Sequence, residues 1–531
     1  MELFSNNGVV IANLAHAVGL FLIALVPAWW LSGRIQEEGT RPFFRFLCAT
    51  GLVLVGYLTF VNLVGRLVSQ STIPASVYFG LCGIAAIAVW RRWPAQTTLR
   101  PLVSSWRDWA GAVLLALVFG LPQWLLAVST PFWDEVAASA IHVTAPNQFA
   151  EGVFPPRHNA LPDIVIKYHY GFTILSGSVK WLTGLTANAS IDMASTGLWL
   201  FAFLFIVYWL RELTFDRLTA LWGAFASLGG GGLSWLYFRR IEAYSGFSVE
   251  PPESQLLHKY SIARSAVQNL LEGARVPSVH LRNADGTLSN LPWDISAEFQ
   301  QHAVALGFAL AIFALYVFIT WQRSTRFRTP LLIITILTFA VVLLGHAVFG
   351  GVAAVTASIV LLLGWLRRPS RQRFLDGVAF GVGVVTVAFL HGGFLAPGAE
   401  YGASADVFTL RRGFGYFRGG VSGFFHWNLA GFGIPLLLSL AAWAAYALQR
   451  RAQARDAQQA LSTREFVFFV LSVFTLFSYF LPQFAFYSSE SSGIEQATEI
   501  SKFFFSARLG FALLSAYGMS VANDVSGVRS K

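Results

Sequence analysis

The sequence is divided into repeated runs of about 20 apolar residues, and this run length constrains the fold more than any other feature. A helix needs about 20 apolar residues, with a range of about 17–25, to cross the hydrocarbon core of a bilayer. On that template we expect thirteen transmembrane helices, near residues 9–31, 46–67, 73–90, 109–128, 191–210, 219–238, 301–321, 330–348, 350–366, 375–394, 429–448, 465–485 and 503–521. The boundary at 348–351 (VFGG) is the least marked, because the runs on either side are nearly continuous.

The composition excludes a soluble globular protein. Of the 531 residues, 55% are hydrophobic and only 12% are charged, whereas soluble domains are about 25% charged. We therefore expect an all-α polytopic membrane protein in which residues 1–531 form a single multi-span domain. The net charge of +10 does not indicate nucleic-acid binding, because the charges lie at the ends of the runs. Cys48 and Cys82 both lie inside apolar runs, so no disulfide framework or zinc motif is predicted.

Lysine and arginine residues alternate in density from one connection to the next, and this alternation predicts the orientation. One set of connections carries a formal charge of +13, whereas the opposite set carries −3. Basic residues near span ends mark the cytoplasmic side. We therefore expect a multi-pass protein of the plasma (inner) membrane with its N-terminus outside and its C-terminus in the cytoplasm. The first run is long enough to remain as a span, and no basic segment precedes it, so we do not expect a cleaved signal peptide.

The long connections all fall on the predicted external side. They cover residues 129–190, 239–300, 395–428 and 486–502, and nine of the ten histidines lie in them or at the outer ends of spans. We therefore expect the functional site to be extracytoplasmic. The sequence has no Gly-rich phosphate loop of the Walker type, so nucleotide is not an expected substrate or cofactor.

Two adjacent carboxylates, Asp134 and Glu135, directly follow a predicted span. Carboxylates at a membrane surface are costly unless they are solvated, paired or bound to a metal. In one interpretation Asp134 caps a short interfacial helix. In the other it is a general base or metal ligand, placed where a lipid-linked substrate meets water.

The next polar group is Lys167-Tyr168-His169-Tyr170, which precedes a segment too short and too interrupted by polar residues to span. We expect that segment to be an amphipathic helix in the membrane interface. The tyrosines are typical of an aromatic belt at the headgroup level, and equally of a pocket for a sugar or phosphate. Both interpretations remain open.

Further along, Glu298 and His302 are four residues apart and would share one face of a helix. They form either a local ion pair or an acid–base or metal pair. The spacing of carboxylates and histidines in the chain specifies no metal site, so the need for a divalent cation stays open. His346 and His391 are expected to be polar packing residues at the outer ends of spans.

Three arginines, Arg411, Arg412 and Arg418, lie on the external side, where no charge bias explains them. Their forked donors suit a phosphate or diphosphate group, and contact with lipid headgroups is the alternative. Lys502, at the start of the last span, either extends to the headgroup level or contacts phosphate.

In their order along the chain, these motifs resemble the GT-C superfamily of membrane glycosyltransferases, and most closely the YYY-type membrane proteins. The resemblance runs from about residue 105 to 520. It includes the Asp134-Glu135 pair, Tyr168-His169-Tyr170-Gly171 before Leu182-Thr183-Gly184, the Glu298 to His302 segment, and Lys502-Phe503. The chain departs from the aromatic triplet at His169.

The resemblance implies transfer of a sugar from a polyprenyl-phosphate donor to an extracytoplasmic glycan, lipid or protein acceptor, with inversion. In that reaction Asp134, beside Glu135, would be the base, and Lys502, Arg411, Arg412 and Arg418 would bind the donor phosphate. Lys167, Tyr168, His169, Tyr170, Glu298 and His302 would line the sugar or acceptor pocket. Two alternatives stay open, namely a transporter or flippase for a lipid carrier and a non-catalytic subunit of an envelope assembly complex.

Overall fold

The computed structural model describes most of the helical part of the chain. The described residues are 7–36, 39–92, 106–129, 143–157, 165, 171–229, 241–244, 280–283, 304–392, 407–410, 428–429, 432–452, 461–488 and 493–526. All structural statements below refer to these residues.

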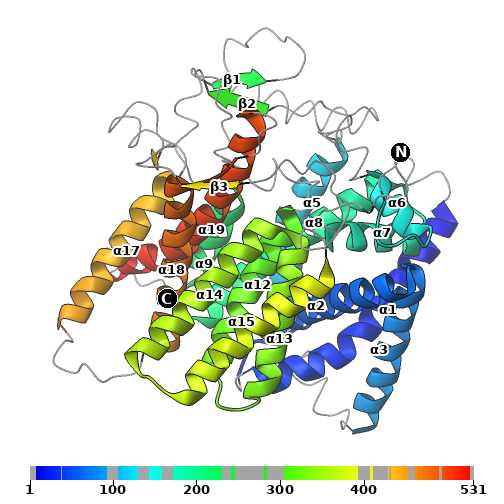
Figure 1. Cartoon of the computed structure of the whole chain (residues 1–531), viewed down its shortest axis with the longest axis horizontal. Helices are drawn as coiled ribbons and strands as arrows, with labels where there is room; N and C mark the ends of the chain where they lie inside the picture. The colour runs from blue at the N-terminus through cyan, green and yellow to red at the C-terminus, as the bar shows by residue number, and fades with distance from the viewer. Residues whose placement is uncertain are drawn as a thin grey trace.

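The described chain is an α-helical, multi-pass membrane fold (Figure 1). Its helices are α1 (Asn7–Ile35), α2 (Pro42–Val68), α3 (Thr72–Arg92), α5 (Trp106–Ser129), α6 (Thr144–Ala150), α7 (Gly171–Thr183), α8 (Ala187–Glu212), α9 (Arg217–Gly229), α12 (Val304–Arg323), α13 (Arg328–Gly345), α14 (Ala347–Arg367), α15 (Arg371–His391), α17 (Gly433–Ala452), α18 (Thr463–Phe484) and α19 (Gly493–Ser526). Each of the thirteen expected spans overlaps one of these helices. Ten helices in the described residues are long and apolar enough to cross a membrane: α1, α2, α3, α8, α12, α13, α14, α15, α18 and α19.

Four short strands complete the described secondary structure. Strand β1 (Ile241–Tyr244) pairs antiparallel with β2 (His280–Asn283), and β3 (Val407–Leu410) pairs antiparallel with β4 (Ala485–Ser488). All four lie outside the ten candidate spans. They therefore add local pairing between connecting segments to a fold that remains helical.

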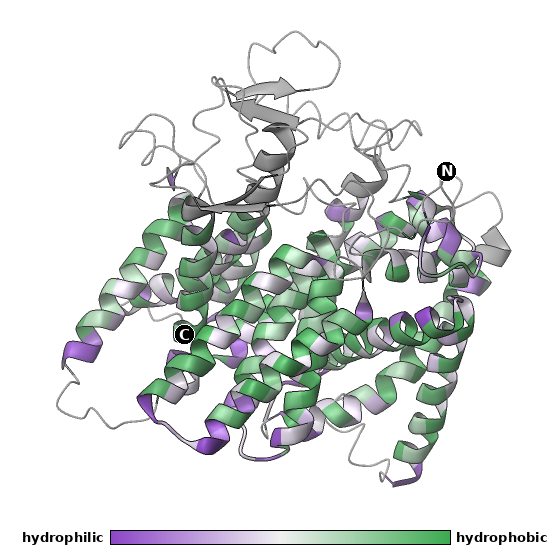
Figure 2. Cartoon of the chain, viewed as in Figure 1, coloured by the Kyte–Doolittle hydropathy of each residue, from purple (hydrophilic) through white to green (hydrophobic). Residues whose placement is uncertain are grey.

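Helix α12 lies at the centre of the bundle and holds it together. Of its most apolar window, 89% is buried inside the protein, against 11% for α3 and 17% for α1. It packs against α8, α13 and α14, and Phe308 of α12 contacts both Trp199 and Phe349. A helix that is apolar on every side is typical of this central position. Helices α1 and α3 lie at the edge of the bundle and are mostly hydrophobic (Figure 2), and many of their apolar side chains are exposed.

The break between α13 and α14 lies earlier than the sequence predicts. We expected it at 348–351, but α13 ends at Gly345 and His346 is the single extended residue before α14. Gly350 is inside α14, where a Cβ atom would lie 2.6 Å from the backbone nitrogen of Leu343. Gly350 therefore allows α14 to pack tightly against α13, and the glycine pair does not interrupt the helix.

The structure confirms the helix expected after Tyr170, which is α7. We expected it in the membrane interface, but it packs among other helices of the protein. Most of its residues are buried, including Phe172, Ile174 and Ser178. It packs against α1, α2, α6 and α8, and the hydroxyls of Tyr57 and Ser178 are hydrogen bonded at 2.5 Å. Its apolar face is thus covered by other helices of the protein.

Arginines gather at one end of the bundle, as the alternation along the sequence predicts. We call this the arginine end, and it comprises the helix termini at Arg34, Arg41, Arg91, Arg107, Arg211, Arg217, Arg323, Arg328, Arg367, Arg371, Arg450 and Arg464. Figure 2 shows hydrophilic helix ends along the lower edge of the view, among them those of α3, α14 and α15. We call the opposite end the histidine end, and it comprises the termini at Val68, Thr72, Ala187, Val304, Gly345, Ala347 and His391.

Contacts between helices hold the arginine end together. They join Arg41 to Glu212 at 3.8 Å, Arg211 to Asp108 at 3.8 Å, Arg450 to Glu465 at 3.3 Å, Arg323 to the carbonyl of Leu461 at 2.8 Å, and Arg464 to Ser520 at 2.9 Å. At most of these connections an arginine is therefore neutralised by an acid on another helix or bound to a fixed oxygen.

Candidate functional site at the histidine end

The residues that we predicted as site residues have no described side chains. Asp134, Glu135, Lys167, Tyr168, His169, Tyr170, Glu298, His302, Arg411, Arg412 and Arg418 lie outside the described residues, and Lys502 is described only as part of the backbone of α19. The structure instead shows where the segments that carry them enter the fold.

Two of these segments enter side by side. Gly171, which directly follows Tyr170, is the first residue of α7 and is buried. A Cβ atom on Gly171 would lie 3.1 Å from Cδ2 of Leu306, in the first turn of α12, and 3.2 Å from the Cα atom of Gly345. The chain carrying the Tyr168-His169-Tyr170 motif and the chain carrying Glu298 and His302 thus join the bundle in direct contact.

His346, between α13 and α14, packs against the same part of α12. A Cβ atom on Gly307 of α12 would lie 2.3 Å from the Cβ atom of His346. The imidazole of His346 is 1% exposed and packs edge-on against Phe349, with ring centroids 5.1 Å apart. Only glycine at position 307 leaves room for this histidine between α12 and α14.

A second pair of motif-bearing segments is joined by the β3–β4 pairing. Leu410, directly before Arg411, is paired with Ala485, and Val407 is paired with Ser488. Strand β4 also contacts α19, the helix that contains Lys502. The segments leading to two of the predicted phosphate-binding groups are therefore joined through this small sheet (Figure 1).

Helix α8 buries a polar face beside this end of the bundle. Asp192, Ser195 and Trp199 follow one another at helical spacing, and none of them is more than 2% exposed. Trp199 packs on Phe308, with ring centroids 5.3 Å apart, so this face is turned toward α12. Within the described chain, Ser195 Oγ and Trp199 Nε1 have no hydrogen-bond partner. Asp192 lies about 7–8 Å along α8 from Ala187, at the helical rise of about 1.5 Å per residue.

Helix α19 buries a cation at a comparable depth. Arg508 is 2% exposed and lies in the candidate span Phe503–Asn523, about 7–8 Å from Phe503. α19 packs closely against its neighbours, because a Cβ atom on Gly510 would lie 2.1 Å from Thr475 Oγ1 of α18. An ionisable side chain inside a membrane span is rare, and its usual explanation is function.

The last residue of α15 is held by two side chains of α2. Asn62 donates a hydrogen bond of 2.9 Å to the carbonyl of His391, and Arg66 donates one of 3.3 Å to the same oxygen. The final carbonyls of a helix have no partner within it, and a cation near them is favourable. The imidazole of His391 is buried at 1% exposure.

The chemistry available at the histidine end is that of separated polar groups in an apolar bundle. The described residues contain no group of three His, Cys, Asp or Glu side chains that could hold a metal ion. Asp192 and Arg508 offer opposite charges on different helices, and Arg66 and His391 offer further donors. These groups suit recognition of a phosphate or a hydroxyl-rich headgroup more than metal coordination.

The sequence analysis missed Asp192 and Arg508, because it placed the charges at the ends of the apolar runs. The signal that identifies Arg508 is one ionisable residue within an apolar run, and Asp192 lies at the start of such a run. Asp376 in α15 gives the same signal, but it lies at the arginine end and is paired with Arg328. The signal therefore finds structural ion pairs as well as site residues.

Comparison with known proteins gives no relative from which a function could be transferred. No protein-family model matches the chain, and no curated protein matches it.

Proposed function

We propose that this protein is an integral-membrane glycosyltransferase of the GT-C type, which transfers a sugar from a polyprenyl-phosphate donor to an extracytoplasmic acceptor by inverting single displacement. The main support is the contact of Gly171 with Leu306 and Gly345. It joins, at one end of a multi-pass helical bundle, two of the segments whose motifs carry the family resemblance. The acceptor is a glycan, a lipid or a protein.

The proposed topology has thirteen spans in the plasma (inner) membrane. The arginine end faces the cytoplasm, in keeping with the bias of basic residues toward that side. The N-terminus and the histidine end then face outward, and the C-terminus is cytoplasmic. An amphiphilic donor would keep its prenyl chain in the bilayer and present its sugar phosphate at the histidine end.

The proposed reaction needs one base and several cations. The acceptor hydroxyl attacks the anomeric carbon and gives its proton to the carboxylate of Asp134, beside Glu135, while the bond from that carbon to the phosphate oxygen breaks. Lys502, Arg411, Arg412 and Arg418 stabilise the charge that develops on the departing polyprenyl phosphate. Lys167, Tyr168, His169, Tyr170, Glu298 and His302 bind the sugar or the acceptor. Arg508 adds a buried cation in the helix that carries Lys502.

The test measures polyprenyl phosphate, a product that forms whichever acceptor is used. The purified protein is reconstituted in liposomes with polyprenyl-phosphate pentoses and hexoses and an envelope extract as acceptor. We expect the wild type to release polyprenyl phosphate. The rate of release should be about 100-fold lower for Asp134→Asn, because a general base contributes at least that factor. Glu151→Gln is the matched control, because Glu151 is an exposed carboxylate in the same long connection. Activity after chelation decides whether a divalent cation takes part.

Two outcomes would contradict the proposal. Absence of polyprenyl phosphate release with every donor of this class would exclude the activity, and the alternative of a non-catalytic subunit would then be favoured. Full turnover by Asp134→Asn would exclude that residue as the base.

A transporter for the lipid carrier is the second candidate, and the burial of Asp192 and Arg508 favours it. Transporters place ionisable groups inside their spans. In liposomes holding a fluorescent polyprenyl-phosphate sugar, a transporter would expose the inner-leaflet probe to an external quencher. Asp192→Asn and Arg508→Gln would abolish that exposure while Asp134→Asn would not. The glycosyltransferase proposal predicts the opposite dependence on Asp134, with turnover as the readout.

A further inference from the structure

The two neighbouring helical hairpins α12–α13 and α14–α15 carry an unusual excess of positive charge. Residues 304–392 contain seven arginines and no lysine, and Asp376 is their one acidic residue. All seven arginines lie at the arginine end. α13 packs against both α12 and α15, so the two connections are neighbours in space.

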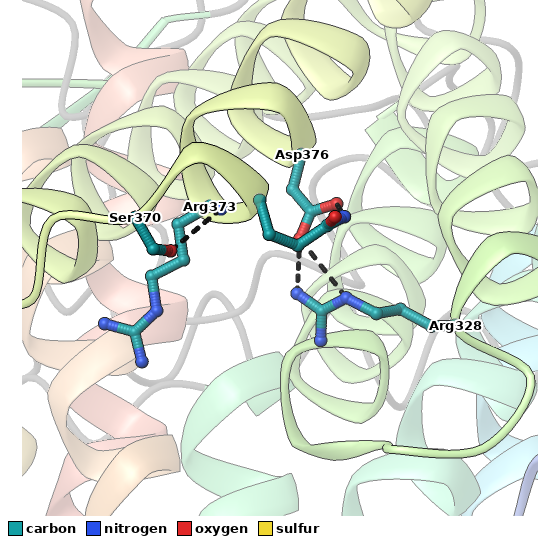
Figure 3. Close-up of polar contacts among 5 residues, drawn as sticks. Arg328, Ser370, Arg373 and Asp376 are labelled. Carbon is teal, nitrogen blue, oxygen red and sulfur yellow. Dashed lines mark hydrogen bonds and ion pairs between the residues drawn. The ribbon is translucent and has the colours of Figure 1, made fainter.

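The single acid is already neutralised. Arg328 donates to Asp376 Oδ2 through Nε at 3.2 Å and also through Nη2, and Gln372 donates to the other carboxylate oxygen at 2.8 Å (Figure 3). Asp376 is 6% exposed. The charge of the carboxylate is therefore paired with Arg328, and it does not balance the charge of the remaining arginines.

The short connection between α14 and α15 is held in a fixed shape by Arg373. Its guanidinium donates to the carbonyls of Gly364 at 2.9 Å and Arg368 at 3.2 Å, at the end of α14. Its backbone nitrogen donates to Ser370 Oγ at 3.2 Å, which caps α15 (Figure 3). A rigid turn therefore presents Arg367, Arg368 and Arg371. All three are exposed, and none makes a side-chain hydrogen bond or ion pair within the described chain.

In three other connections at the arginine end, an arginine faces an acidic side chain. Arg41 and Arg211 face Glu212 and Asp108, and Arg450 faces Glu465. The α14–α15 connection has no such acid within the described residues. We call it, with Arg367, Arg368, Arg371 and Arg373, the arginine turn.

An exposed apolar strip continues from the arginine turn along the same two helices. Leu362 and Leu366 of α14 are 53% and 57% exposed, and Phe374 and Leu375 of α15 are 53% and 46% exposed. Trp365 and Phe374 bridge the two helices, with ring centroids 6.0 Å apart. Cations above an apolar strip match the headgroup and acyl chains of a phospholipid.

We propose that the arginine turn binds an anionic phospholipid. Its phosphate lies among Arg367, Arg368 and Arg371, and its acyl chains lie along the strip of Leu362, Leu366 and Phe374. Forked guanidinium donors suit a phosphate diester, and basic residues at a membrane surface attract anionic lipids additively. This inference does not depend on the proposed glycosyltransferase activity.

The test uses the full-length protein in detergent, titrated with phosphatidylglycerol or phosphatidylcholine and followed by native mass spectrometry. We expect phosphatidylglycerol to bind at least about tenfold more tightly than phosphatidylcholine. The variant Arg367→Gln/Arg368→Gln should lose about tenfold or more of that affinity. Arg91→Gln/Arg92→Gln is the matched control, because it removes an exposed arginine pair from the end of α3. The control should change the affinity less than about threefold.

Three results would overturn the proposal. An equal loss in both double variants would mean that the charge of the whole end attracts lipid without a defined site. Complete competition by soluble glycerol phosphate at equal concentration would identify a free phosphate site. A variant Arg367→Gln/Arg368→Gln that keeps the wild-type preference for phosphatidylglycerol, at an unchanged unfolding temperature, would show that these two arginines do not bind the phosphate.

Discussion

The guanidinium of Arg66 in the last turn of α2 donates a hydrogen bond of 3.3 Å to the carbonyl oxygen of His391, the last residue of α15. The next residue, Gly392, has φ +73° and ψ −123°, so the chain turns away immediately after this bond. Two helices far apart in the sequence are thereby fixed to each other at the histidine end. The segment that leads toward Arg411 begins at this point.

Gly392→Ala should destabilise the protein by about 1–3 kcal/mol, because only glycine adopts this backbone conformation without strain. A Cβ atom there would also lie 2.0 Å from Nη1 of Arg66 and displace the guanidinium. Thermal unfolding in detergent measures the effect. Gly351→Ala is the control, since nothing lies within 4 Å of a Cβ at that helical position, and it should be neutral or slightly stabilising. Equal stability of Gly392→Ala and Gly351→Ala would show that the backbone at position 392 does not require glycine.

The ion pair of Arg328 and Asp376 should contribute to stability through coupling. Asp376→Leu should cost about 1–2 kcal/mol, because it leaves Arg328 and Gln372 without their acceptor. The double variant Arg328→Met/Asp376→Leu should cost less than the two single changes together. A double-mutant cycle by denaturant unfolding tests this, and additive single effects would mean that the two helices are not held by this pair.

Asp216 should make the stability of α9 depend on pH in the acid range. Its Oδ1 accepts from the backbone nitrogen of Thr219 at 3.0 Å, as an N-cap does. Burial acts to raise the pKa of Asp216, but hydrogen bonds from the side chain and backbone of Thr219 outweigh it and hold the pKa below its usual value.

Because the folded pKa is lowered, the stabilisation is present above the unfolded pKa of about 3.9 and is lost as pH falls through the folded value. The wild type should therefore exceed Asp216→Ala by about 1 kcal/mol at pH 6 and by clearly less at pH 3. Unfolding temperatures across this range provide the measurement. If the difference in stability between the wild type and Asp216→Ala does not vary with pH, the charge of Asp216 contributes nothing to stability.

The helices could be predicted from the sequence, because the length of an apolar run is set by the bilayer and not by tertiary contacts. The end of α13 could not. It depends on His346 fitting over Gly307, a contact between helices that no local pattern reveals. The same holds for α7, whose amphipathic pattern fits a membrane interface and a groove between helices equally well.

The candidate site was predicted from polar motifs in the connections, and its residues stay predictions. The buried groups Asp192 and Arg508 were overlooked because one charged residue changes the mean hydropathy of a run very little. Their burial follows from packing against other helices, in particular from the contact of Trp199 with Phe308 on the face that holds Asp192. Such packing is a property of the assembled bundle and not of one segment.

Lys502→Ala should weaken use of the donor more than use of the acceptor, because its proposed partner is the donor phosphate. We expect KM for the polyprenyl-phosphate sugar to rise about tenfold, which is the effect of losing one charged hydrogen bond. Lys180→Ala is the control, since Lys180 of α7 instead donates to the carbonyl of Leu185 at 3.4 Å. An equal rise in KM for the donor and in KM for the acceptor would contradict a role for Lys502 at the donor phosphate.

The proposed topology predicts that the two ends of the bundle differ in their access to reagents. Single cysteines at Thr325, in the α12–α13 connection, and at Glu151, after α6, are both exposed positions. They are introduced after replacement of Cys48 and Cys82, which are free thiols in the protein. In intact cells a membrane-impermeant maleimide should label the cysteine at 151, and it should label the cysteine at 325 only after permeabilisation. The reverse pattern would place Asp134 in the cytoplasm, where the proposed donor does not present its sugar, and the proposed reaction would then be wrong.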